Sequence, residues 1–260
     1  MSEQRTVLIS GAAAGIGRCI AERFLAEGDA VHVCDVSETA VADFLSANPG
    51  ATASVVDVSK RAEVDRLFAE FSEHHSNLDI LVNNAGIAGP VGPVETLDED
   101  GWDECLGINL SGSFYMTRRA VPLLRKSGDA SIINISSTAG LMGCPNRSPY
   151  VASKWAQIGL TKTWAMELGP AGIRVNAVCP TSVDGDRIER VIAGEAAERN
   201  MSGEEIRDVY LRQTSLRSFA TSDEVADTVL FLASDQARRI SGQALAVDGH
   251  TEGFLNWLDD

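Results

Sequence analysis

Short apolar runs alternate along the whole chain with longer segments in which apolar residues recur at intervals of three and four. Short apolar runs between turn residues predict buried β-strands, and the longer spacing predicts amphipathic helices. Ile20, Phe24 and Leu25 illustrate the helical spacing. The predicted strands are Thr6–Ser10, Ala30–Cys34, Ala53–Val56, Asp79–Val82, Ala130–Ile135, Ile173–Val178 and Ala244–Val247.

Strands that alternate with helices predict an α/β fold with a parallel sheet, because each parallel strand is reached by a right-handed crossover. The predicted strands are short and mainly apolar, which suits a sheet covered by helices on both faces. No Pro/Ser-rich linker, repeat or low-complexity tract divides the chain. We therefore expect one domain over residues 1–260, built as a doubly wound, seven-stranded parallel sheet.

One segment interrupts this alternation. From Asp184 to Ser215, two polar helical pieces lie between predicted strands and carry little apolar surface to bury. An excursion of this length inside a compact domain is typical of a functional lid. We expect residues 184–215 to form a helical substrate lid, with a pair of solvated surface helices as the alternative.

Charge and cysteine content narrow the function classes. The chain has 260 residues, with 22 Lys and Arg against 37 Asp and Glu and a net charge of −15. Such a surface repels nucleic acid and anionic membranes, and no apolar run approaches a membrane-spanning length. The five cysteines form no C-x-x-C pair, so neither a disulfide framework nor a metal site is expected. A glycine motif already at Gly11 leaves no room for a signal peptide, and we expect a cytoplasmic enzyme.

A glycine-rich segment follows the first predicted strand directly and precedes a helix expected near Arg18. Glycines let the backbone turn sharply and approach a pyrophosphate, and the helix N-terminus offers its N–H groups to the phosphates. The position between strand and helix makes this motif more specific than glycine spacing alone. The predicted cofactor-binding residues here are Ser10, Gly11, Gly15, Ile16 and Gly17.

Asp35 ends the second predicted strand, 20 residues after Gly15. A carboxylate at this point can accept hydrogen bonds from the adenosine ribose hydroxyls. Neither Val36 nor residues 12–14 supply a cation for a 2′-phosphate. We therefore expect NAD rather than NADP, although Asp35 could instead be only a helix N-cap.

Tyr150 and Lys154 lie four positions apart in a segment of helical character, which places both side chains on one helix face. A phenol has a pKa near ~10 in water, and a neighbouring ammonium lowers it by favouring the phenolate. Such a pair can carry out acid–base catalysis. The pair alone is only moderate evidence, because a chain with three Tyr and four Lys can contain it by chance.

Two further polar residues belong to this chemistry. Ser137 follows a predicted strand, where a doubly wound sheet places its site, and its hydroxyl can hydrogen-bond a substrate carbonyl. Ser136 competes for this role on local grounds. Asn109 is a polar residue in an otherwise core-like helix, and it could equally satisfy a buried backbone group.

Together these motifs resemble the short-chain dehydrogenase/reductase family in its single-domain form of about 250 residues. The resemblance covers nearly the whole chain, and motifs in the family's order are more specific than any one of them. The matching residues are Gly11-x3-Gly15-x-Gly17, Asp57-Val58, Asn83-Asn84-Ala85-Gly86, Asn109, Ser137, Tyr150-x3-Lys154 and Pro180.

The resemblance implies a Rossmann-type fold and assigns roles in the reaction. It implies that Tyr150 is the catalytic acid/base and that Lys154 binds the nicotinamide ribose and lowers the tyrosine pKa. Ser137, rather than Ser136, would polarise the reacting C–O group. Asn109 would hold a water that links Lys154 to solvent as a proton relay.

The resemblance also implies further contacts with the cofactor. Asp57 and Val58 would contact the adenine, Asn84 the adenosine side, and the backbone N–H of Val183 the nicotinamide carboxamide. Gly86 and Pro180 complete the implied cofactor site. The chain departs from the usual pattern at Thr181, where the family commonly has Gly, and at Gly185, where it commonly has Thr. Orientation of the nicotinamide could then rely on backbone contacts or on the hydroxyls of Thr181 and Ser182.

Substrate contacts are expected between the catalytic face and the lid. Arg147 lies three residues before Tyr150, and Arg187 lies in the lid. An arginine that enters the pocket would suit an anionic substrate group, although arginines of an acidic protein commonly pair with surface carboxylates. Phe254 and Trp257 near the C-terminus could bury against a partner subunit, and similar proteins are commonly homotetramers.

The predicted function is that of an NAD-dependent oxidoreductase that interconverts a secondary alcohol and its ketone, with Tyr150 as the acid/base. The expected substrate is a small polar alcohol such as a sugar, a polyol or a hydroxy acid. One alternative is a ketone reductase of the 3-oxoacyl type. Another is a non-redox or catalytically silent NAD-binding relative.

Overall fold

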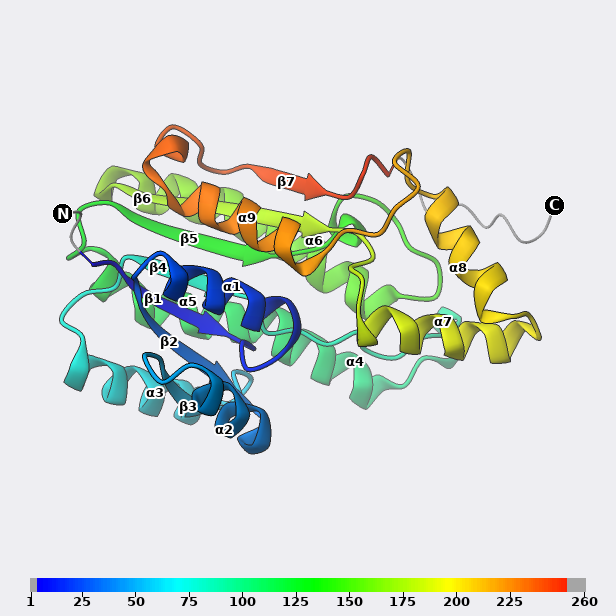
Figure 1. Ribbon diagram of the computed structural model, residues 1–260, viewed down its shortest axis with the longest axis horizontal. Coiled ribbons are helices and arrows are strands. Elements are labelled where there is room, and N and C mark those ends of the chain that lie inside the picture. Colours follow the sequence, from blue (N-terminus) through cyan, green and yellow to red (C-terminus); the bar gives the residue numbers. More distant parts are fainter. Residues whose placement is uncertain (1–3, 252–260) are drawn as a thin grey trace.

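The computed structural model describes residues 4–251 and contains a parallel sheet of seven strands in the order β3-β2-β1-β4-β5-β6-β7. Helices flank the sheet in a single domain (Figure 1). This confirms the predicted fold class. The strands are β1 Thr6–Ser10, β2 Ala30–Asp35, β3 Thr52–Val55, β4 Ile80–Asn83, β5 Ala130–Ile135, β6 Ile173–Pro180 and β7 Ala244–Val247.

The helices form two layers because successive strand residues point to opposite faces of the sheet. Val7 and Ile9 pack under α1, α2 and α9, whereas Leu8 belongs to the apolar cluster under α3, α5 and α6. The helices are α1 Gly15–Ala26, α2 Glu38–Ala47, α3 Arg61–His74, α4 Glu99–Leu106, α5 Ser113–Leu124, α6 Ser148–Leu168, α7 Asp186–Arg199, α8 Gly203–Arg212 and α9 Ser222–Ala233. A π-helical turn, Gly107–Gly112, joins α4 to α5, and short 3-10 turns cover Val94–Thr96, Thr138–Gly140, Gly169–Ala171 and Asp235–Ala237.

Most predicted boundaries agree with the structure to within two residues. Two differences affect the site. Helix α1 begins at Gly15, within the glycine motif rather than near Arg18, and β6 continues past Val178 to Pro180. Pro180 pairs with Val247 on β7, so the carboxyl end of the sheet extends close to the lid segment, which begins at Asp184. No helix within residues 4–251 is long and apolar enough to cross a membrane.

The excursion predicted as a lid contains α7 and α8, which lie beyond the carboxyl ends of β5, β6 and β7 (Figure 1). Its two ends meet, because the Asp184 amide donates to the Ala220 carbonyl at 2.8 Å and the Ala220 amide donates to the Ser182 carbonyl at 3.1 Å. The segment therefore leaves and re-enters the domain at one place. This arrangement is compatible with a lid.

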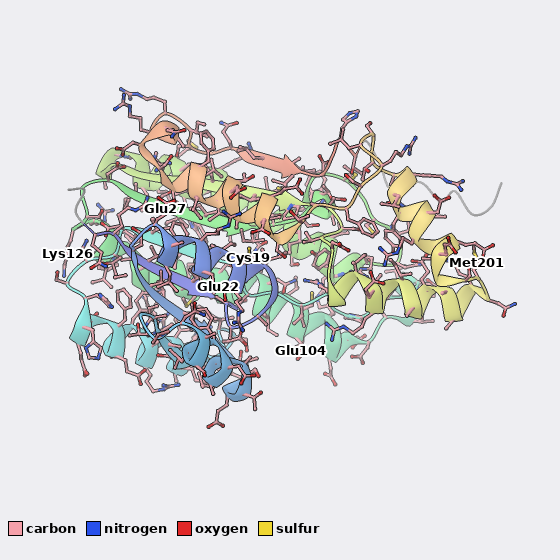
Figure 2. All side chains as sticks on the ribbon, viewed as in Figure 1. Cys19, Glu22, Glu27, Glu104, Lys126 and Met201 are labelled. Carbon is pink, nitrogen blue, oxygen red and sulfur yellow. The ribbon has the colours of Figure 1, made fainter. Side chains whose placement is uncertain are left out.

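The expectation that these helices have little to bury is wrong. They form an apolar cluster of their own, in which Ile206 is fully buried and Ile192 is 3% exposed. Met201, labelled in Figure 2, packs against this cluster. The apolar residues are too sparse to show a continuous stripe in the sequence, because each helix contributes only a few and the cluster is complete only when the two helices meet.

Ile206→Ala tests whether this cluster holds the lid together. Removing a buried isoleucine side chain costs about 2–4 kcal/mol through lost burial and the cavity left behind. We expect faster hydrogen exchange confined to residues 186–212, with the sheet amides unchanged. Leu216→Ala is the matched control, because Leu216 is 72% exposed. Equal exchange in the two variants would show that the cluster does not stabilise α7 and α8.

Candidate active site

The glycine loop after β1 has no room for side chains at two of its glycines. A Cβ on Gly11, whose φ is +61°, would lie 2.7 Å from Cα of Ala85. A Cβ on Gly17 would lie 2.4 Å from the carbonyl oxygen of Gly11. Gly15 also has a positive φ, of +56°, but a Cβ there would meet nothing within 4 Å. The backbone of the loop is thus close-packed at Gly11 and Gly17 and unobstructed at Gly15, which fits a binding site for a pyrophosphate.

Asn84 holds this loop in place. Its side-chain amide donates to the carbonyl oxygens of Ser10 and Gly11 at 3.1 and 2.6 Å, and the Ser10 hydroxyl accepts from the amides of Asn84 and Ala85. The hydrogen bonds of Asn84 therefore join the end of β4 to the end of β1. The structure gives Asn84 a supporting role for the loop, in addition to the cofactor contact that the resemblance implies.

Asp35 lies at the carboxyl end of β2, beside the glycine loop. Its carboxylate accepts hydrogen bonds from the amides of Ala13 and Ser37, both at 3.2 Å. The N-cap of α2 is Ser37, whose hydroxyl accepts from the amide of Ala40, so the alternative interpretation of Asp35 as the N-cap is wrong. No ion pair reaches Asp35 from the described residues, and Val36 beside it is 69% exposed.

Asp57 and Val58 follow β3 and line the same edge of the sheet. The Asp57 carboxylate accepts hydrogen bonds from the amide and hydroxyl of Ser59 at 2.9 and 2.7 Å. Val58 is 6% exposed and packs against Gly112, where an added Cβ would lie 2.7 Å from its side chain. Both residues are thereby fixed in orientation, close to the turn that carries Asn109.

Tyr150 and Lys154 share one face of α6, as their spacing predicts. The Lys154 ammonium lies 5.6 Å from the centre of the Tyr150 ring and is buried, with the residue 3% exposed. It donates to the carbonyl oxygen of Ile135 at 2.8 Å and to the side-chain oxygen of Gln157 at 3.1 Å. Tyr150 is partly exposed. A partly exposed tyrosine therefore lies beside a buried, hydrogen-bonded cation.

The electrostatics of this pair favour the phenolate. Burial by itself raises the pKa of Tyr150, but the positive charge of Lys154 and then of Arg187, the Ser137 hydroxyl and Arg147 outweigh it and lower the pKa below its usual value. Burial likewise lowers the pKa of Lys154, and the phenolate opposes that shift. The arrangement can hold and release a proton at the Tyr150 oxygen closer to neutral pH than a free phenol can.

The structure distinguishes the two serines after β5. Ser136 is buried, and its hydroxyl donates to the carbonyl oxygen of Lys154 at 3.0 Å. Ser137 is partly exposed, accepts from the amide of Ala139 at 3.1 Å and influences the titration of Tyr150. Only Ser137 is therefore placed to hydrogen-bond a molecule in front of Tyr150.

Asn109 lies in the π-helical turn and is fully buried. Its side-chain oxygen accepts from the amide of Ile87 at 2.8 Å, and its amide donates to the Ile87 carbonyl and the Ser153 hydroxyl, both at 3.0 Å. The side chain thus fixes the loop after β4. Gly86 is part of the same packing, because a Cβ there would lie 3.2 Å from the Asn109 side-chain oxygen and 3.5 Å from the Lys154 nitrogen.

The carboxyl end of β6 brings the last predicted cofactor residues to this edge. The carbonyl oxygen of Pro180 faces the Ser137 hydroxyl at 3.5 Å. Val183 forms a parallel bridge with Ala220, and the hydrogen bonds of that bridge use the Asp184 amide and the Ser182 carbonyl rather than the Val183 amide. The predicted residues from β1, β2, β4, β5, β6 and α6 therefore meet at one edge of the sheet.

Comparison with known proteins agrees with this arrangement. A family model described as enoyl-(acyl carrier protein) reductase matches residues 11–251. The chain is 38% identical to a 3beta-hydroxysteroid dehydrogenase of Mediterraneibacter gnavus, over 98% of this chain and 96% of that protein. It is 35% identical to a 3-oxoacyl-(acyl-carrier-protein) reductase of Thermotoga maritima, over 95% and 97%. The crystal structure of an NAD⁺-bound xylitol dehydrogenase matches with a TM-score of 0.87 and 27% identity, over 95% of this chain and 98% of that one.

The chain belongs to the short-chain dehydrogenase/reductase family. It is an oxidoreductase of this family, and interconversion of an alcohol with a ketone fits its relatives and its site. Dehydrogenases of the family use nicotinamide cofactors. The glycine loop and the carboxylate of Asp35 fit such a group.

Sequence reasoning missed one residue of the site, Gln157. It is 1% exposed and lies three positions after Lys154 on α6. Its side-chain oxygen accepts from Lys154, while its amide donates to the Asn109 carbonyl oxygen at 2.9 Å and to the Ser113 hydroxyl at 3.1 Å. Gln157 thus joins the two residues that the resemblance links through a water. A polar residue on the buried face of α6 was the available signal.

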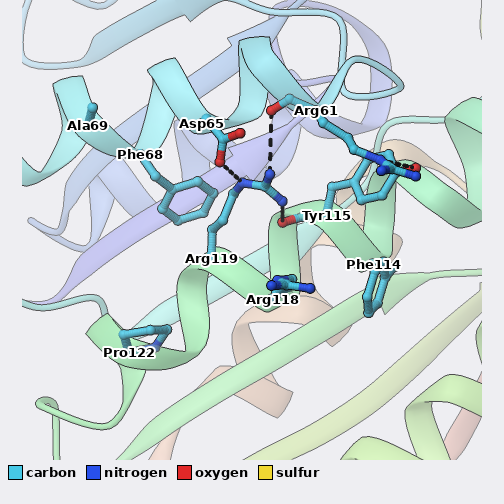
Figure 3. Close-up of a pocket in the computed structure, with 9 residues that line it drawn as sticks. All are labelled: Arg61, Asp65, Phe68, Ala69, Phe114, Tyr115, Arg118, Arg119 and Pro122. Carbon is cyan, nitrogen blue, oxygen red and sulfur yellow. Dashed lines mark hydrogen bonds and ion pairs between the residues drawn. The ribbon is translucent and has the colours of Figure 1, made fainter.

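A second hollow of about 830 Å³ lies between α3 and α5, outside the site just described (Figure 3). Its arginines are largely engaged by their neighbours. Arg119 donates to Asp65 at 2.5 Å and to the Tyr115 carbonyl, and Arg61 donates to the Tyr115 hydroxyl at 3.1 Å. The hollow contains none of the residues predicted to act in the reaction.

Gln157→Leu tests the bridge between Lys154 and Asn109. The change leaves a buried ammonium short of one acceptor and a buried carbonyl short of a donor, at a cost of about 3 kcal/mol. We expect this loss in the free energy of unfolding, measured by urea titration. Thr163→Val is the control, since the exposed Thr163 hydroxyl bonds only to its own helix at Gly159, and it should change stability by less than about 0.5 kcal/mol. Similar losses in both variants would contradict the bridge.

Proposed function

We propose that this protein is an NAD-dependent oxidoreductase that interconverts a small polar secondary alcohol and its ketone, with Tyr150 as the acid/base. The observation that carries the proposal is the partly exposed Tyr150 phenol, placed before the buried Lys154 ammonium and beside the Ser137 hydroxyl. Sugars, polyols and hydroxy acids are the proposed substrate class. The likeness to a xylitol dehydrogenase supports a polar alcohol.

In the proposed reaction the Ser137 hydroxyl hydrogen-bonds the substrate oxygen and holds it against the Tyr150 oxygen. In the oxidation direction, the Tyr150 phenolate takes the proton of the substrate hydroxyl, and in the reverse direction the phenol returns it. The bound nicotinamide supplies the hydride acceptor or donor. Lys154 favours the phenolate by its charge, while the carbonyl of Ile135 and the side chain of Gln157 hold the ammonium in place.

Asn109 has a supporting part in this proposal. Its side chain fixes the loop at Ile87, and its carbonyl oxygen is joined to Lys154 through Gln157. We propose that Asn109 holds a water that links Lys154 to solvent, as the resemblance implies, and that Gln157 adds a direct link between the Asn109 backbone and Lys154. An amide carries no proton readily at neutral pH, so Gln157 is a positioning residue.

The NAD preference rests on Asp35, since its carboxylate lacks a cationic partner among the described residues and would repel a 2′-phosphate. The residues proposed to hold the cofactor are Ser10, Gly11, Gly15, Ile16, Gly17, Asp35, Asp57, Val58, Asn84, Gly86, Tyr150, Lys154, Pro180 and Val183. Residues 184–215 are proposed to close over the substrate, with Arg147 and Arg187 among its contacts.

Assembly and location complete the proposal. We propose a homotetramer, supported by apolar side chains exposed on α5 and α6, where Phe114 is 43%, Trp155 51% and Met166 81% exposed. Phe254 and Trp257, on which the expectation of a tetramer rested, lie outside the described residues.

A cytoplasmic location is proposed from the number and spacing of the cysteines.

Tyr150→Phe tests the reaction class. We expect wild-type protein to form NADH with a member of a panel of polyols, sugars and hydroxy acids, and the variant to be slower by about two to four orders of magnitude. Absorbance of the reduced cofactor is the measurement, with NADP run in parallel. A preference for NADP would contradict the role of Asp35. Reduction of 3-oxoacyl thioesters alone would favour the ketone-reductase alternative, and binding of NAD without any turnover would favour the non-redox one.

The pH dependence of oxidation tests the influence of Lys154 on Tyr150. Oxidation requires the phenolate, so kcat/KM rises with pH as Tyr150 loses its proton. Lys154 is the leading cationic cause of the lowered Tyr150 pKa, so Lys154→Met should raise that pKa. The rise of kcat/KM with pH, which is the acid limb of the profile, should then move to higher pH. Lys162→Met, an exposed change on the same helix, should leave the limb in place. An unmoved limb in Lys154→Met would contradict the proposal.

A further inference from the structure

We propose that Arg147 and Arg187 bind an anionic group of the substrate, so that within the proposed class this enzyme acts on a hydroxy acid and its keto acid. The inference rests on the proposed function and narrows its substrate class. It is carried by Arg147, whose guanidinium lies over the Tyr150 ring, and it is supported by the charge of Arg187 on α7; neither arginine pairs with a carboxylate that the structure describes.

Arg147 is the first of these arginines. It lies directly before α6, and its guanidinium carbon is 5.4 Å from the centre of the Tyr150 ring. Its Nε is buried and has no hydrogen-bond partner within the described part of the chain. A buried donor of a charged group that stays unpaired is costly. A carboxylate bound in front of Tyr150 would supply the missing acceptor, in the two-pronged geometry that guanidinium groups favour.

Arg187 is the second, and it comes from the first turn of α7. Arg187 is exposed, and its charge lowers the pKa of Tyr150 and that of Lys154, so it acts on Tyr150 from the lid. No ion pair joins it to an acidic residue among those described. An anion between the two arginines would therefore contact both Arg147 at the start of α6 and Arg187 in the lid.

Other arginines show that pairing is common in this acidic chain. Arg5 pairs with Asp29 at 2.6 Å, and Arg23 pairs with Asp223 at 2.9 Å. Within the lid, Arg207 pairs with Glu189. The sequence argument that arginines of an acidic protein find surface carboxylates thus holds for these residues and fails for Arg147 and Arg187.

One acidic residue, Glu195, acts on groups that Arg147 also influences. It belongs to α7 and raises the pKa of both Cys144 and Tyr210. The Glu195 carboxylate is already engaged, since it accepts from Arg199 at 2.9 Å and from the Tyr210 hydroxyl at 2.8 Å. These two bonds hold Glu195 within α7 and α8 and leave Arg147 available to an external anion.

A different role for both arginines is purely electrostatic, because they lower the Tyr150 pKa together with Lys154. The two roles differ in what they predict. A change in the Tyr150 pKa affects every alcohol alike and moves the pH profile, whereas anion binding affects only charged substrates and acts mainly through KM. A charged substrate and its uncharged analogue therefore separate the two roles.

The experiment compares hydroxy acids with their methyl esters as substrates for wild type, Arg147→Met, Arg187→Met and Arg190→Met. The acids are both enantiomers of 3-hydroxybutyrate and of lactate, beside the polyol and sugar panel. We expect wild type to favour an acid over its ester, and Arg147→Met and Arg187→Met each to lower kcat/KM for that acid by about ten- to a hundredfold, mainly through KM. The ester should change by less than about threefold, because it lacks the carboxylate that the arginines would bind. Arg190→Met, an exposed arginine of the same helix, should match wild type.

A second readout needs no turnover. Butyrate has the carboxylate but no hydroxyl, and it should raise the thermal unfolding temperature of the wild-type protein with NADH, whereas butyramide should not. The effect of butyrate should disappear in Arg147→Met, whose own unfolding temperature also shows whether that variant is folded.

Three results would overturn the inference. Turnover of polyols or esters with no preference for an acid would overturn it and leave the proposed function standing. Equal losses for acid and ester, with a shifted pH profile, would make the arginines electrostatic residues only. No turnover of any alcohol in the panel would overturn the proposed function and this inference with it.

Discussion

The burial of one ammonium group constrains the whole site. Lys154 is 3% exposed, so its charge must be met inside the protein. The carbonyl at the end of β5 and the side chain of Gln157 supply its acceptors. The strand, the helix and the π-helical turn must therefore keep a fixed relation to one another. The position of Tyr150 is fixed in the same way, because Tyr150 shares a helix face with Lys154.

This constraint explains why the glycine loop and the catalytic helix are tied together through the loops after β4. Asn84 joins that region to the cofactor loop, and Asn109 joins it to the π-helical turn. Both asparagines use their side chains to satisfy backbone groups where the regular hydrogen bonding of the sheet has ended. The supporting network consists largely of amides, which hold geometry without titrating near neutral pH.

The sequence predicted what depends on local pattern and missed what depends on long-range packing. β1, β5 and β7 were predicted at their observed residues, since their apolar runs are bounded by turn residues. The placement of Tyr150 over Lys154 followed from helical periodicity. Gln157 was missed because its partners, Asn109 and Ser113, lie more than 40 positions away in the sequence. The cluster around Ile206 and the pairing of the arginines were also beyond reach, because both depend on which helices meet in space.

The bridge between Val183 and Ala220 has a consequence for how such proteins diversify. The segment between these residues departs from and returns to one pair of backbone positions, and it has its own apolar cluster. A replacement segment of different length or sequence would need to satisfy that junction and the pairing of Thr214 with Thr251, while the sheet and α6 stayed as they are. Because we propose that this segment closes over the substrate, we expect its exchange, by recombination in evolution or by grafting in the laboratory, to change substrate preference.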